Sequence, residues 1–402
     1  MQLAGAQHLG HLTYCTNIHA GETWPEVLAG LRTHLPPIKA AVAPGQPLGV
    51  GLRLSAEAAE ALDEPAAFAE FDAFLDEGGY YVYTINGFPY GAFHGQRVKE
   101  GAYRPDWSQA PRLTYTNRLA DLLARLLPAG MTGSVSTVPG TFKPWAEGAV
   151  DAIAENLARH VAHLVALEAR TGKTVVLALE PEPYCLLETI DETIAFFEQR
   201  IFAAAAAERV SALTGLPAAA AAEALRRHIG VCYDVCHAAV EFEDPRASIA
   251  ALRAAGIQIA KLQLSSALRI RSVDATTAQR LGPFDEPVYL HQVVERRGGE
   301  LRRYLDLPEA LEGIGEAQGN EWRIHFHVPI FLEELEAFST TQEFLRAILS
   351  QHRDQPISQH LEVETYTWDV LPPRHREVEV SAARCRPRAC LTRSLHPSLQ
   401  GK

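Results

Sequence analysis

Short apolar segments that end in acidic, imidazole or amide side chains recur along this chain. The segment 229–233 is typical of a buried strand, and Asp234 and His237 follow at its carboxyl end. A carboxylate and an imidazole are costly to bury there unless a metal ion or a polar ligand compensates them. The fold must therefore be one that gathers strand ends around a polar site.

The same pattern occurs on other predicted strands. Residues 174–179, 257–262, 323–329 and 361–363 are apolar or alternate between apolar and polar side chains. Residues two apart share one face of a strand, so several strands direct polar side chains the same way. These polar residues are Glu180, Glu182, Lys261, Gln263, His325, His327, Glu362 and Glu364.

Predicted strands alternate with predicted helices from one end of the chain to the other. The eight expected strands span residues 12–18, 48–54, 80–85, 133–138, 174–180, 229–234, 257–264 and 360–365. This alternation predicts a (β/α)8 TIM barrel, whose active sites lie at the carboxyl ends of the strands. A doubly wound open sheet is the competing fold. It usually has a Gly-rich phosphate turn after its first strand, where this chain has Thr16-Asn17-Ile18-His19.

Two insertions interrupt the simple barrel pattern. Residues 87–112 follow the third strand, and their aromatic side chains predict either an ordered lid over a pocket or an ordinary structural loop. In the second insertion, residues 269–330, we expect a hairpin around Gly298-Gly299 and then an extra strand over 323–330. Residues 1–373 are expected to form one domain. Residues 374–402, rich in Arg, Pro and Ser, are expected to form a basic, disordered tail.

Composition excludes several classes of protein. The chain has 402 residues, 47% of them apolar, which suffices for a large core, and a formal charge of -12 that disfavours nucleic-acid binding. No apolar run approaches the ~20 residues that span a bilayer, and the N-terminal residues do not resemble a secretory signal. Four cysteines in or beside predicted strands indicate buried reduced thiols and a cytoplasmic protein. They are Cys15, Cys185, Cys232 and Cys236.

Several motifs resemble those of a known superfamily. Asp234-Val-Cys-His237-Ala-Ala-Val-Glu-Phe-Glu-Asp-Pro-Arg, followed by Lys261-Leu-Gln-Leu, resembles the xylose-isomerase-like barrels of sugar isomerases, epimerases and AP endonucleases. Glu180-Pro is similar to that superfamily's metal ligand on the fifth strand. The resemblance implies one divalent ion (Mn, Mg or Zn) held by carboxylates and a His. Gln263 stands where that His is usual, so either the Gln oxygen or a His of the extra strand is expected to replace it.

More closely, the chain resembles the EboE family, the metabolite traffic proteins of the Ebo cluster. The matching segments extend from His11-Leu-Thr-Tyr-Cys-Thr-Asn-Ile-His19 to Val363-Glu-Thr-Tyr-Thr-Trp368, and include Asn86-Gly-Phe-Pro-Tyr-Gly-Ala-Phe-His94 and Leu179-Glu-Pro-Glu-Pro-Tyr184. They cover the chain to about residue 373. This resemblance implies a small-molecule metabolite and other Ebo-cluster proteins as partners.

The candidate site residues follow from the pattern and the resemblance together. The expected metal ligands are Glu180, Asp234, Gln263, His327 and Glu364. The expected substrate contacts are His19, His94, Glu182, Glu188, His237, Lys261 and His325. Structural alternatives stay open for many of these residues: a salt bridge from Glu180 to Lys261, solvated positions for the two loop glutamates, or hydrogen bonding and packing for the histidines.

These residues predict a chemistry. A divalent ion would polarise the carbonyl of a hydroxy-ketone, while Glu180 and Glu364 remove and return a proton beside it. The expected function is that of an isomerase or epimerase acting on a sugar or polyol. A non-catalytic metabolite-binding or handover protein is one alternative. An AP-endonuclease-like phosphoesterase is another, although the acidic composition argues against it.

Overall fold

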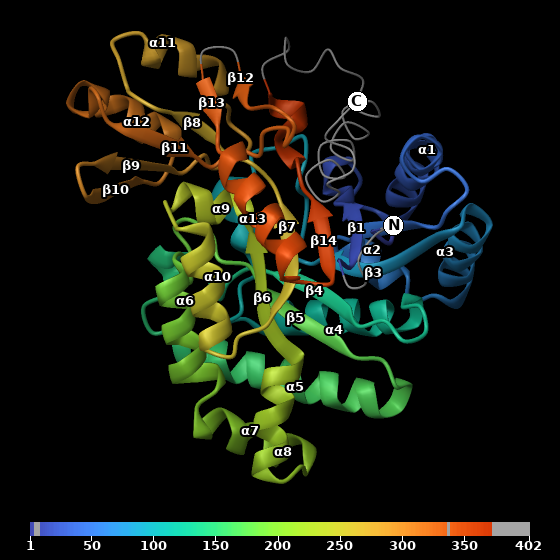
Figure 1. Ribbon diagram of the computed structural model, residues 1–402. Helices are drawn as coiled ribbons and strands as arrows, with labels where there is room; N and C mark the ends of the chain where they lie inside the picture. Colours follow the sequence, from blue (N-terminus) through green and yellow to red (C-terminus); the bar gives the residue numbers. More distant parts are fainter. Residues whose placement is uncertain (4–8, 336–337, 372–402) are drawn as a thin grey trace.

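A computed structural model describes residues 1–3, 9–335 and 338–371 of the protein. Eight parallel strands form one sheet in the order β1-β14-β7-β6-β5-β4-β3-β2 (Figure 1). They are β1 (His11–Tyr14), β2 (Leu48–Arg53), β3 (Tyr80–Asn86), β4 (Gly133–Thr137), β5 (Val175–Leu179), β6 (Ile229–Asp234), β7 (Ile259–Leu264) and β14 (His360–Val363). The predicted (β/α)8 barrel is confirmed. The predicted tail, residues 374–402, lies outside the described residues.

The barrel closes between β1 and β2 largely through one side chain. Cys15 and Gly51 form a single parallel bridge. The hydroxyl of Thr13 donates to the carbonyl of Gly49 at 2.7 Å and accepts from the N–H of Gly51 at 2.9 Å. A threonine hydroxyl thus satisfies backbone groups that a longer strand ladder would otherwise pair.

Helices surround the barrel, and their ends agree with local sequence signals. They are α1 (Trp24–Val42), α2 (Ala56–Ala61), α3 (Pro65–Gly78), α4 (Ala110–Leu126), α5 (Val150–Thr171), α6 (Ile190–Phe196), α7 (Ala204–Thr214), α8 (Ala218–His228), α9 (Val235–Val240), α10 (Pro245–Ala254) and α13 (Gln342–Asp354). Thr189 and Glu192 form a capping box at the start of α6, and Asp244 caps α10. Pro65 starts α3 at its first turn, which divides the stretch after β2 into two helices.

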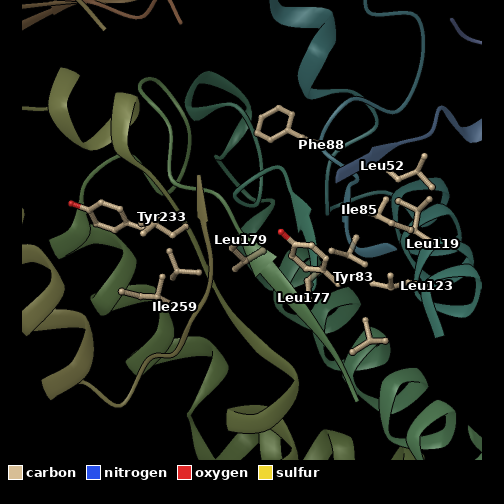
Figure 2. Close-up of a cluster of buried hydrophobic side chains, with 14 of the residues drawn as sticks. Leu52, Tyr83, Ile85, Phe88, Leu119, Leu123, Leu177, Leu179, Tyr233 and Ile259 are labelled. Atoms are coloured by element: carbon tan, nitrogen blue, oxygen red, sulfur yellow. The ribbon is translucent and has the colours of Figure 1, made fainter. Parts of the chain in front are cut away.

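The core lies between the outer face of the barrel and these helices. Figure 2 shows Ile85 of β3 beside Leu119 and Leu123 of α4, and all three side chains are fully buried. The strand β5 is apolar throughout, as expected for a parallel strand that is covered on both faces. Each such buried Leu or Ile contributes roughly 1.5–3 kcal/mol, so the packed barrel is a rigid frame for its polar strand ends.

The second insertion and the residues that follow it, up to Thr340, form a separate antiparallel sheet, in the order β10-β9-β11-β8-β13-β12 (Figure 1, upper left). Its elements are β8 (Leu268–Ile270), α11 (Thr277–Leu281), β9 (Val293–Arg297), β10 (Glu300–Tyr304), α12 (Leu307–Glu312), β11 (Glu321–Ile324), β12 (Glu334–Leu335) and β13 (Phe338–Thr340). The predicted hairpin around Gly298-Gly299 is confirmed by the pairing of β9 with β10.

The extra strand expected over 323–330 is wrong in extent. It ends at Ile324 and pairs within the insertion, with β8 and β9, rather than in the barrel. The chain then leaves the sheet, because the N–H of Val328 bonds to the carbonyl of Ser266 at 2.9 Å instead of extending the ladder. His325 and His327 are therefore on a connecting segment. Among the described residues, no helix has both the length and the apolar character needed to cross a bilayer.

Candidate metal centre

Three buried carboxylates meet at the carboxyl ends of the barrel strands. Glu180 follows β5, Asp234 ends β6 and Glu364 follows β14, with exposed fractions of 2%, 2% and 4%. One oxygen from each lies within 4.8 Å of the other two. The structure thus brings together three residues that the strand-end pattern selected, from segments 54 to 184 positions apart in the chain. Three anionic side chains so close together repel one another strongly unless a cation or protons intervene.

Two oxygens in this cluster have no hydrogen-bond donor among the described residues: Oε2 of Glu180 and Oδ2 of Asp234. The other oxygen of Asp234 accepts from the hydroxyl of Ser265 at 2.5 Å and from the N–H of Cys236 at 2.7 Å. Buried anionic atoms without a partner are expensive. A divalent cation held between them would satisfy both, so the donor set fits a metal ion.

Amide groups hold the remaining carboxylate oxygens. Glu364 accepts from Asn17 at 2.6 Å and Asn86 at 3.0 Å through one oxygen, and from Gln263 at 2.6 Å through the other. The same amide nitrogen of Gln263 donates to Glu180 at 2.9 Å. The expectation that Gln263 offers its oxygen as a ligand is therefore corrected. If the side-chain amide of Gln263 were turned over, its oxygen would face two carboxylates and repel them. The amide nitrogen of Gln263 therefore donates to both carboxylates.

Three imidazoles converge next to the carboxylates. Nε2 of His325 lies 3.1 Å from Nε2 of His237 and 3.2 Å from Nε2 of His327. Nδ1 of His237 faces the carbonyl of Pro181 at 2.9 Å, and Nδ1 of His325 faces the side-chain oxygen of Gln292 at 2.7 Å. These oxygens only accept, so both Nδ1 atoms carry the proton and two Nε2 lone pairs face each other. Two facing lone pairs repel each other unless a metal ion or a proton lies between them.

Burial dominates the titration of these groups. It raises the pKa of Glu364 to about 8, with repulsion from Asp234 adding to it, and raises the pKa of Glu180 well above its usual range. Burial opposes ionisation of Asp234 too, but His237 and His327 outweigh it and lower the pKa of Asp234. Burial lowers the pKa of His327 to about 4 and that of His325 well below its usual range. His325 and His327 are thus neutral at physiological pH, the form that binds metal.

Lys261 lies deeper in the barrel than expected for a substrate contact. Its Nζ is 2.5 Å from a carboxylate oxygen of Glu362, and both side chains are fully buried. It also donates to the hydroxyl of Ser136 at 3.2 Å. Its direct ion-pair partner is therefore Glu362, so the salt bridge from Glu180 to Lys261 that we considered is not formed.

A cavity of about 50 Å³ lies above the carboxylates. Its aromatic wall comes from three separate segments: Phe88, Phe93 and Tyr103 from the first insertion, Tyr289 from the second, and Tyr366 from the turn after β14. The side chains of Glu180, Glu182, His237, His325 and Glu364 also line it. The first insertion thus supplies part of the wall of this cavity.

Besides Lys261, three predicted substrate contacts are not brought to this cavity. His19 lines a separate small cavity and stacks on His34, with ring centroids 4.0 Å apart. Glu188 pairs with Lys143 at 2.5 Å. His94 packs against the ring of Phe93 and is not part of the cavity lining. Each of these three side chains makes its contacts elsewhere and does not line the shared cavity.

Sequence reasoning missed four residues that contribute to the centre: Asn17, Asn86, Gln292 and Tyr366. The first two follow or end strands β1 and β3, so the same strand-end rule could have identified them. The other two lie in a loop of the second insertion and in a turn after β14. No pattern in the sequence places either beside His325, although both contact it.

Comparison with protein-family models and with curated proteins finds no match. Among solved structures, the probable 3-DHS dehydratase AsbF from Bacillus anthracis aligns over 95% of this chain and 98% of its own, at 14% identity and a TM-score of 0.45. A xylose isomerase domain protein from Planctomyces limnophilus aligns over 96% and 97%, at 14% identity and 0.46. The IolI protein with a bound zinc atom aligns over 98% and 100%, at 10% identity and 0.44. The barrel topology of this chain is established by its own strand order.

Proposed function

We propose that this barrel binds a divalent metal ion through Glu180, Asp234 and Glu364, and isomerises or epimerises a small hydroxy-carbonyl metabolite of the sugar or polyol type. The unpartnered oxygens of Glu180 and Asp234 carry this proposal. The lysines near the cavity do not balance them, because Lys261 pairs with Glu362 and Lys99 pairs with Asp306 at 2.6 Å. A bound cation is the simplest compensation for this concentration of negative charge.

The residues of the cavity suit proton transfer beside a carbonyl. When bound, the ion would polarise a substrate carbonyl. Burial raises the pKa of Glu364 to about 8 and that of Glu180 well above its usual range in the metal-free centre. A bound ion would favour their carboxylate forms, which can accept a proton from the substrate. The side-chain oxygen of Asn17 is buried without a donor and its residue lines the cavity, so it is suited to accept a substrate hydroxyl. The aromatic wall would exclude water from the reacting atoms.

The imidazole group supports a second metal position beside the first. Asp234, His237 and His327 offer ligand atoms within 4.8 Å of one another, as do Glu182, His237 and His325. Carboxylates favour Mg²⁺ or Mn²⁺, whereas imidazoles favour Zn²⁺ and its neighbours. We therefore propose that ions of different chemistry occupy the two positions, with Asp234 facing both.

The resemblance to the EboE family supports a metabolite traffic role, in which the protein binds a metabolite and passes it to Ebo-cluster partners without turnover. The imidazole group favours a third possibility, an AP-endonuclease-like phosphoesterase, since such enzymes use several metal ions. The formal charge of -12 argues against a nucleic-acid substrate.

The four described cysteines are free thiols, which supports a reducing compartment such as the cytoplasm.

Metal analysis of the purified protein tests the proposal. We expect a stoichiometric ion in the wild type and its loss in Asp234→Asn and in Glu180→Gln. Glu295→Gln is the matched control, because Glu295 is equally buried but bonds Tyr304 and Asn320 in the second insertion. A wild type that takes up no ion would refute the metal site. Turnover on a panel of keto-sugars then separates an isomerase from a metabolite-binding protein, and a nuclease assay tests the phosphoesterase.

A further inference from the structure

Four buried side chains form an unbroken line of hydrogen bonds behind the imidazole group. His325 Nδ1 and the side-chain oxygen of Gln292 are 2.7 Å apart, and the amide nitrogen of Gln292 is 3.0 Å from the hydroxyl of Tyr103. That hydroxyl lies 2.8 Å from a carboxylate oxygen of Glu182. None of the four residues is more than 6% exposed. The line therefore runs through the interior, where hydrogen bonds polarise one another.

The direction of each bond is determined by its partners. The hydroxyl of Tyr103 donates to a carboxylate oxygen of Glu182 and accepts from the amide nitrogen of Gln292. That nitrogen also donates to the carbonyl of Pro183 at 3.2 Å, which fixes the orientation of the amide. The amide oxygen is then left to accept the proton of His325 Nδ1. All three donors thus point toward the same carboxylate.

The far end of this line is the Nε2 lone pair of His325. A carboxylate that accepts from one imidazole nitrogen makes the other nitrogen a better metal ligand, and fixes the tautomer and the ring orientation. Here the carboxylate of Glu182 lies 3.7 Å from His325 Nδ1, beyond hydrogen-bonding distance. The amide of Gln292 and the phenol of Tyr103 fill the gap between them.

We infer that Gln292 and Tyr103 are positioning residues that link the carboxyl group of Glu182 to His325 through hydrogen bonds and so set the metal affinity of the imidazole group. This rests on the metal site proposed above. Tyr103 comes from the first insertion, Gln292 from the second, and Glu182 from the loop after β5. The ring of Tyr103 stacks on Phe142 with centroids 5.0 Å apart, which holds the hydroxyl in place. Both insertions must therefore be docked before His325 is fully oriented.

Titrations with two ions on Tyr103→Phe and Gln292→Met test this inference. Co²⁺ followed by visible absorption reports nitrogen ligands, and Mn²⁺ followed by electron paramagnetic resonance reports the carboxylates. We expect Co²⁺ affinity to fall about 10-fold in Tyr103→Phe and about 100-fold in Gln292→Met, with a shifted Co²⁺ spectrum. Mn²⁺ affinity should stay at the wild-type value in both variants, because the carboxylate group does not depend on this line of bonds.

Tyr304→Phe is the matched control, since it removes a buried hydroxyl that donates to Glu295 at 2.7 Å within the second insertion. It should bind both ions like the wild type. If Gln292→Met loses affinity for both ions, the substitution has damaged the fold. The Co²⁺ titration of Tyr103→Phe then tests the inference, because that variant keeps the ring and its stacking. If Tyr103→Phe keeps the Co²⁺ affinity and spectrum of the wild type, this inference is overturned but the proposed function is not. A wild type that binds neither ion would overturn the proposed function as well.

Discussion

Glu364 accepts hydrogen bonds from three side-chain amides, yet burial raises its pKa to about 8. Protons therefore compete with a metal ion for this carboxylate at neutral pH. We expect the affinity for Mn²⁺ to rise between pH 6 and 8, because ion binding must release a proton from Glu364 below its pKa. Calorimetric titrations at four pH values measure this, and a flat profile would contradict it.

Lys261 and Glu362 form an ion pair with no exposure at all. Removing only the lysine, in Lys261→Met, leaves a buried carboxylate without its partner and should lower the free energy of unfolding by about 3–5 kcal/mol. Urea unfolding measures this loss. The double variant Lys261→Met/Glu362→Met should recover much of it, since neither charge then remains buried. An equal loss in the single and double variants would show that packing, not charge, is responsible.

At the scale of elements, the closure of the barrel depends on a glycine in β2. A Cβ at Gly51 would overlap the carboxylate of Glu362 on β14 and the carbonyl of Tyr14 on β1. Glu362 is held by Lys261 and cannot withdraw easily. Gly51→Ala should therefore destabilise the protein by about 1–3 kcal/mol, as overpacking of a core does.

Thermal unfolding tests this prediction, with Gly315→Ala as the control. Gly315 lies in a short helical turn of the second insertion, and a Cβ there meets nothing within 4 Å. Equal melting temperatures for Gly51→Ala and the wild type would show that β1 and β2 can separate to admit a methyl group.

The end of strand β11 shows what a sequence pattern does not predict. The period-two alternation of residues 323–328 predicts a strand, but β11 ends at Ile324. One more backbone bond follows, from the N–H of His325 to the carbonyl of Gln292, and the chain then turns toward the barrel. A pattern of side chains cannot show which carbonyl will accept a given N–H. That choice brought His325 and His327 to the candidate metal centre instead of leaving them on a sheet.

For the whole molecule, buried titratable groups set how stability depends on pH. Burial lowers the pKa of His360 to about 3 and that of His327 to about 4, whereas histidine in the unfolded chain titrates near 6.5. The unfolded chain therefore binds more protons between these pH values, and the free energy of unfolding rises with pH up to about 6.5. Burial raises the pKa of Glu241 and Glu364 to about 8. The folded protein therefore keeps protons that the unfolded chain has released above about pH 4.5, and this contribution is lost as pH rises through 8.

These opposite contributions nearly cancel between about pH 4.5 and 6.5. The metal-free protein should therefore lose stability between about pH 6.5 and 8, and be less stable at pH 9 than at pH 7. Saturating Mn²⁺ should reduce the loss at pH 9, because the ion replaces the proton on Glu364. Urea unfolding at pH 5, 7 and 9, with and without the ion, measures both effects. Higher stability at pH 9 than at pH 7 without metal would contradict the assignment of raised pKa values to these carboxylates.

The sequence by itself determined the barrel and the choice of Glu180, Asp234 and Glu364, because strand periodicity and strand ends are local properties and parallel strands bring their carboxyl ends together. Only the tertiary structure decided that Gln263 donates rather than ligates, that Lys261 is paired with Glu362, and that His19 points elsewhere. Those outcomes depend on which partner reaches each polar atom across the barrel. Such long-range pairing has no signature in the spacing of residues along the chain.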